Sequence, residues 1–247
     1  MDNLITYISL IGVVLLGGFL VFFLKEKITG SLKYILAYSG AFMLAISVLH
    51  LIPEVYGAQK YSMGIYVLIG FLIQLILEYF SQGIEHGHIH VHENKSSRFL
   101  APILISLCLH ALLEGVPLAK DFTHEIHNHG HEHHHGNSFL ISILMHKFPI
   151  AIALMTLFIK SKIKLSIAFT WLIVFALMAP LGNFIGTQFS SFFSENQSII
   201  NNILGIVLGM FLHISTTILF ESDESHKFNL LKLIIILIGG GTAILVV

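Results

Sequence analysis

Eight long apolar runs account for most of this chain, and short polar segments separate them. Each run has about 18 to 22 residues, the length that an α-helix needs to cross the hydrocarbon core of a bilayer. Because 55% of the residues are hydrophobic and only 11% are charged, little sequence remains for a soluble domain. We therefore expect an all-α membrane protein, a single transmembrane domain over residues 1–247 with eight helices in one bundle. The expected spans are residues 4–24, 34–52, 63–80, 99–119, 139–159, 165–185, 199–220 and 230–247.

The basic residues predict how these spans are oriented. Lys and Arg gather on the cytoplasmic side of membrane proteins. If the N-terminus is outside, Lys60 and Lys120 fall in outer segments, Lys147 falls within a span, and the rest of the 13 basic residues fall on the inner side. We therefore expect both termini outside, in a multi-pass protein of the cell (inner) membrane. The inner basic residues are Lys25, Lys27, Lys33, Lys95, Arg98, Lys160, Lys162, Lys164, Lys227 and Lys232.

Histidine gathers in two polar segments, residues 81–98 on the inner side and 120–138 on the outer side. Clustered His is typical of loose metal capture, although a solvated linker of biased composition is the alternative. Since Cys108 is the only cysteine, internal disulfides and multi-cysteine zinc sites are excluded. We see no basic patch that would indicate a nucleic-acid partner. The histidines concerned are His86, His88, His90, His92, His124, His127, His129, His131, His133, His134 and His135.

Ionisable residues inside two neighbouring spans predict a functional site. His110 and Glu114 are four residues apart, which places them on one helix face, and the next span carries His146. Such groups at membrane depth are expensive and normally have a partner. At about 1.5 Å per residue, Glu114 and His146 each lie roughly 10 Å below the outer ends of their helices. Two imidazoles and a carboxylate at one level form a ligand set for a divalent metal, above all zinc.

Less specific interpretations of these residues remain open. A His within a span can serve only as a hydrogen-bond partner between helices. Glu114 can instead pair with Lys147, which follows His146 directly. Pro117 and Pro149 come shortly after the polar residues and predict bends in the fourth and fifth helices. Bent helices at membrane depth often form ion sites.

Taken in order along the chain, these motifs resemble the ZIP (Zrt/Irt-like) family of divalent metal transporters. The fourth span contains HALLEG at residues 110–115, where the family has His-Asn-x-x-(Asp/Glu)-Gly, and the fifth contains HKFPIA at 146–151, where it has His-Glu-x-Pro-His-Glu. Further similarities are HLIPE at 50–54, Glu78 followed by HGHIH at 86–90, PLG at 180–182 and GMFLH at 209–213. The resemblance implies eight helices with both termini outside, inward metal transport and a homodimer.

Departures from the family pattern imply one metal rather than two. The family's first site would use His110, Glu114, His146 and the position of Ile150, so that three of four ligands are present. Its second site would use the positions of Ala111, Lys147 and Ala179, and none of these is a ligand. We hypothesise that the Lys147 ammonium takes the electrostatic place of the second metal. The alternative is that Lys147 extends towards the outer membrane surface.

Five further polar residues are candidates for the transport path. His213 lies in the seventh span, where it lines the path or makes a structural hydrogen bond. His50 and Glu54 end the second span on the outer side and can guide ions inward or anchor the helix. Glu78 and Glu221 lie near inner helix ends and are candidates for release.

The expected function is transport of a divalent cation, most simply zinc, towards the cytoplasm through one intramembrane site. A lipid hydrolase that uses zinc is the first alternative, but we find no spare carboxylate near the site to act as its acid or base. A metal-gated membrane sensor is the second. We therefore expect a transporter rather than an enzyme, with a metal substrate, the lipid bilayer and a second copy of the chain as partners, and no catalytic cofactor.

Overall fold

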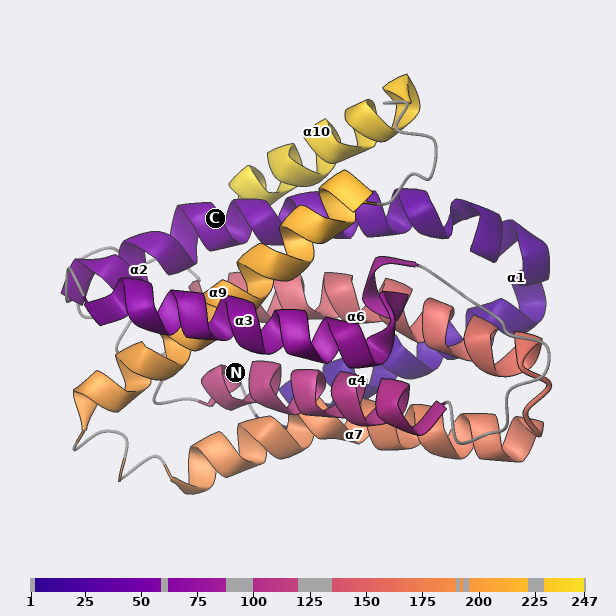
Figure 1. Ribbon diagram of the computed structural model, residues 1–247, viewed down its shortest axis with the longest axis horizontal. Coiled ribbons are helices and arrows are strands. Elements are labelled where there is room, and N and C mark those ends of the chain that lie inside the picture. Colours follow the sequence, from indigo (N-terminus) through magenta and orange to yellow (C-terminus); the bar gives the residue numbers. More distant parts are fainter. Residues whose placement is uncertain are drawn as a thin grey trace.

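The computed structural model describes residues 3–58, 62–87, 100–119, 135–189, 192, 196–221 and 229–246, and within these ranges the regular secondary structure is entirely helical. Figure 1 shows most of the helices lying side by side along the long axis of the molecule, with α9 and α10 running obliquely to it. The helices are α1 (Asn3–Ile46), η1 (Ser47–Leu51), α2 (Ile52–Ala58), α3 (Ser62–Ser81), η2 (Ile84–His86), α4 (Leu100–Gly115), η4 (Val116–Leu118), α6 (His135–Lys160), α7 (Leu165–Gln188), α9 (Gln197–Glu221) and α10 (Leu230–Val246).

Seven segments of the described residues are long and apolar enough to cross a membrane, and they overlap the first seven expected spans. Two of them lie within α1 and its extension through η1 and α2, and Figure 1 shows the ribbon of α1 turning back between them. The eighth expected span corresponds to α10, which is apolar but only 17 residues long. Large apolar side chains such as Phe23 and Leu245 are more than 80% exposed. A surface of this kind requires lipid, so the chain is an integral, multi-pass membrane protein.

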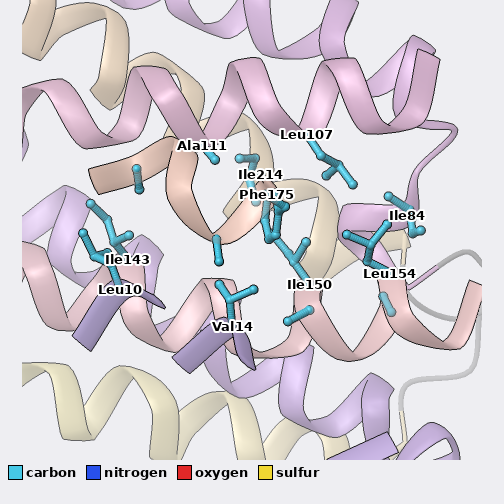
Figure 2. Packing of buried hydrophobic residues seen from close by; sticks show 14 of the residues in the cluster. Leu10, Val14, Ile84, Leu107, Ala111, Ile143, Ile150, Leu154, Phe175 and Ile214 are labelled. Carbon is cyan, nitrogen blue, oxygen red and sulfur yellow. The ribbon is translucent and has the colours of Figure 1, made fainter. Parts of the chain in front are cut away.

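Helix α6 forms the centre of the bundle. It packs along α1, and its residues from Ile150 to Met155 have no exposed surface. Figure 2 shows side chains from α1, α4, α6, α7 and α9 meeting in one apolar cluster, including Leu10, Leu107 and Phe175. A polar side chain on the buried part of this helix must therefore have its partner inside the protein.

Glycines allow the helices that flank the site to approach closely. A Cβ atom at Gly115 would overlap the backbone carbonyl of Ala179 on α7, and one at Gly182 would overlap the carbonyl of Leu112 on α4. The contact between α3 and α9 depends on Gly209 in the same way. Small residues at helix crossings permit such backbone contact.

The prolines act differently from one another. Pro117 lies in η4, directly after α4 ends, whereas Pro149 lies inside α6, which continues as one helix to Lys160. A bend at Pro149 stays a prediction. The sequence did not predict the π-helical turn η1, which precedes Pro53. Its widened turn contains the carbonyl of Leu49, four residues before that proline, where the proline ring would clash with a regular α-helix.

Candidate metal centre

The structure brings together three polar residues that the sequence singled out. His110 and Glu114 lie one turn apart on α4, and His146 lies on α6. One ligand atom from each residue can be chosen so that all three lie within 4.8 Å of one another. All three side chains are fully buried, and the two imidazole rings meet edge to face at a centroid distance of 6.0 Å. Their role as metal ligands remains a prediction.

The polar atoms of this group are poorly satisfied by the protein itself. Within the described residues, both His146 ring nitrogens have no hydrogen-bond partner, and the Glu114 oxygens make ion-pair contacts with His110 and Lys147 without an aligned hydrogen bond. His110 Nε2 lies 2.7 Å from Glu114 Oε1, but the two groups are not aligned for a hydrogen bond. A buried polar atom without a partner costs about 1–3 kcal/mol. A cation held between the imidazoles and the carboxylate would satisfy several of these atoms at once, and this donor set suits zinc.

Lys147 points into the same group. Its Nζ lies 2.8 Å from Glu114 Oε2 and 5.3 Å from the centre of the Phe175 ring, and only 2% of its side chain is exposed. The alternative in which Lys147 extends to the outer surface is therefore wrong. Burial against Phe175 and attraction to the carboxylate keep the ammonium inside. Glu114 thus directs one oxygen towards His110 and the other towards Lys147.

Two residues that the sequence patterns did not indicate, Gln74 and Glu85, form a hydrogen-bonded chain that ends at His110 Nδ1. Gln74 of α3 is fully buried, and its amide oxygen lies 2.9 Å from His110 Nδ1. Its amide nitrogen donates a hydrogen bond of 2.6 Å to Glu85 Oε2 in η2. Burial raises the pKa of the Glu85 carboxyl above its ordinary value. The signal in the sequence that could have indicated Gln74 is its side-chain amide within an apolar span, because such groups usually form hydrogen bonds to neighbouring helices.

A second polar cluster lies one turn further along α3. Glu78 follows Gln74 by four residues; its Oε1 lies 3.0 Å from His86 Nε2, and its Oε2 bonds His213 Nε2 on α9. The rings of Phe71 and His213 are nearly perpendicular, with their centroids 4.6 Å apart. Glu78 and His213 were candidates from the sequence, whereas their pairing with each other and the contact of Glu78 with His86 were not predicted.

The other sequence candidates are either absent from the metal-holding group found among the described residues or lie outside those residues. His50 is in η1 and Glu54 in α2, and neither belongs to a metal-holding group among the described residues. Glu221 ends α9, and its side chain lies outside the described residues. The side chains of His88, His90 and His92 in the inner segment, and of the histidines in the outer segment, also lie outside the described residues.

Comparison with known proteins assigns the chain to a family. Residues 98–246, well over half of the sequence, match the family described as ZIP Zinc transporter. The chain belongs to this ZIP family. The match runs from α4 to α10 and includes His110, Glu114 and His146, whereas Gln74 and Glu85 precede it. ZIP proteins are transporters rather than enzymes.

A curated ZIP protein also resembles the chain. It is the protein named zinc transporter ZIP1 from Danio rerio, which is 29% identical over 160 residues. The aligned part is 62% of this chain and 48% of that protein, so the chain spans about half the length of the relative it matches.

Proposed function

We propose that this chain moves a divalent cation, with zinc as the preferred ion, through a single intramembrane site formed by His110, Glu114 and His146. The observation that carries the proposal is the convergence of these buried side chains from α4 and α6, in which both His146 ring nitrogens have no hydrogen-bond partner among the described residues. Three protein ligands leave a coordination position open, so the ion can enter and leave by exchanging water. A transport site has to bind strongly enough to strip water from the ion and weakly enough to release it.

Lys147 supplies the second positive charge of this site. Its ammonium lies against Glu114 at the place where the family resemblance implies another metal. The lysine neutralises part of the carboxylate charge and thereby weakens its hold on the transported ion. Loading with one cation and easy release both follow from this arrangement.

The path runs from the outer His-rich segment, residues 120–138, to the inner one, residues 81–98. His50 and Glu54 stand at the entrance. Past the metal site, Glu78 with His86 and His213 offers a carboxylate between two imidazoles, and Glu221 lies further inward. The inward direction is carried over from the family resemblance, whereas the distribution of basic residues indicates only how the helices are oriented.

The membrane arrangement proposed for this path has eight spanning helices in a single domain, residues 1–247, in the cell membrane. Both termini are outside, α10 serves as the eighth span, and the fourth and fifth helices bend at their prolines. Two copies of the chain associate as a homodimer.

Purified protein in sealed lipid vesicles tests the proposed function. We expect zinc uptake by the intact protein, its loss in His110→Ala and in His146→Ala, and no turnover of lipid. Ser106→Ala is the matched control, because among the described residues this buried hydroxyl on α4 donates to the Ile103 carbonyl of its own helix. Zinc binding without uptake would indicate a sensor, and lipid hydrolysis would indicate an enzyme; either result would overturn the proposal.

A further inference from the structure

We infer that Gln74 is a positioning residue that sets which ring nitrogen of His110 carries the proton, and that Glu85 holds the Gln74 amide in the required orientation. The inference rests on the proposed function, because it takes His110 as a ligand of the transported ion. It concerns two residues outside the part of the chain that matches the ZIP family.

The orientation of the amide follows from its contact with Glu85. The Gln74 nitrogen lies 2.6 Å from Glu85 Oε2, and an amide nitrogen can only donate. Glu85 Oε2 accepts this bond whether the carboxyl is ionised or carries a proton on Oε1, which has no hydrogen-bond partner among the described residues. Turning the amide over would place its oxygen against Glu85 Oε2, which could bond it only by donating a proton from that atom. The Gln74 oxygen therefore faces His110.

The tautomer of His110 follows from that oxygen. It can only accept, so the proton in the 2.9 Å contact belongs to His110 Nδ1. In a neutral imidazole the other nitrogen, Nε2, then carries the lone pair. Nε2 is the atom that lies 2.7 Å from Glu114 Oε1. The lone pair and the carboxylate oxygen face each other, an arrangement that a cation bound to both atoms stabilises.

Metal ligands in proteins often depend on such outer partners. A hydrogen bond to the far nitrogen fixes the ring orientation and increases the basicity of the coordinating one, and its removal typically lowers metal affinity by about 10–100-fold. The hydrogen bond between Gln74 and Glu85 also links two elements, since Gln74 lies on α3 and Glu85 lies in η2. The His110 imidazole is therefore held by a side chain from a helix other than its own. Ser106 on α4, by contrast, donates to the Ile103 carbonyl of α4 among the described residues.

Substitution at two positions separates positioning from simple packing. Gln74→Leu removes the acceptor, and Gln74→Met is a second variant whose unbranched side chain keeps the length of glutamine. The double variant Gln74→Glu with Glu85→Gln exchanges carboxylate and amide. In that variant a glutamate oxygen accepts from His110 Nδ1, while its other oxygen accepts from the new amide. Ser106→Ala is the control for loss of a buried polar group nearby.

Two readouts are required, both on metal-free and zinc-titrated protein in detergent. The first is the ¹⁵N chemical shift of each His110 ring nitrogen above the histidine pKa range, assigned by the signals missing from His110→Ala. The second is the dissociation constant for zinc. We expect the proton on Nδ1 in the intact protein. Both single variants should mix the tautomers and weaken zinc binding about 10–100-fold. The exchanged pair should restore both properties, and Ser106→Ala should change neither.

A proton on Nε2 in the intact protein would overturn the inference without any variant. So would a folded Gln74→Leu or Gln74→Met protein with unchanged tautomer and unchanged zinc affinity. These results differ from failure of the proposed function, in which the intact protein does not bind zinc or His146→Ala binds it equally well. The tautomer measured in the metal-free protein does not depend on that outcome.

Discussion

The ion pair between Lys147 and Glu114 is the feature whose removal should change both stability and transport. Lys147→Met removes the ammonium, which lies over the Phe175 ring, and keeps an unbranched apolar side chain. At the observed 2.8 Å and an effective dielectric constant of about 20, the attraction is about 6 kcal/mol. Desolvation offsets part of it, and removal of one partner of a buried pair typically destabilises by about 3–5 kcal/mol.

The same substitution should strengthen zinc binding. Without the ammonium, Glu114 presents its full charge to the ion, and the repulsion between two cations disappears. An increase in affinity of about tenfold corresponds to only about 1.4 kcal/mol, a small part of that electrostatic change. Tighter binding slows release, so the rate of uptake should fall although affinity rises.

Thermal inactivation with and without zinc, zinc binding and vesicle uptake are the assays. We expect Lys147→Met to unfold at lower temperature, to gain more stability from zinc than the intact protein, and to transport more slowly. Lys160→Met, at an exposed lysine on the same helix, is the control and should behave like the intact protein. Adding Glu114→Gln to Lys147→Met should recover stability but not zinc binding, because no buried charge is then left unpaired. If Lys147→Met has unchanged stability, affinity and rate, the lysine does not act as a substitute for a second metal.

Two further predictions concern the support of the site and the path beyond it. Gly115→Ala should force α4 away from α7, reduce stability by about 1–3 kcal/mol or more, and lower zinc affinity by displacing Glu114. At Gly12 a Cβ atom would meet open space, so Gly12→Ala should lower neither stability nor zinc affinity. Equal thermal stability of the two variants would contradict the close-packing argument. Glu78→Gln should slow vesicle uptake while zinc binding at the proposed site is retained, because a neutral amide replaces the carboxylate between His86 and His213. Normal uptake by this variant would remove Glu78 from the path.

Much of the candidate site could be predicted from the sequence because it depends on local geometry. Helical periodicity places His110 and Glu114 on one face, and the lengths of the apolar runs place His146 at the same depth. The first seven spans were predicted for the same reason, since crossing a bilayer requires a minimum apolar length. The 17 residues of α10 are close to that minimum, so length alone does not decide whether α10 is the eighth span.

Packing between helices decided the rest. Whether Lys147 turns towards Glu114 or the membrane surface depends on the rotation of α6 within the bundle, and periodicity leaves that rotation open. Gln74 reaches His110 across 36 positions of sequence, and Glu78 reaches His213 across 135. Contacts over such separations arise from close approach of α3 to α4 and α9, made possible in part by Gly209. Apolar length and period specify each helix by itself, whereas the partners of a buried polar group are known only when the neighbouring helix is in place.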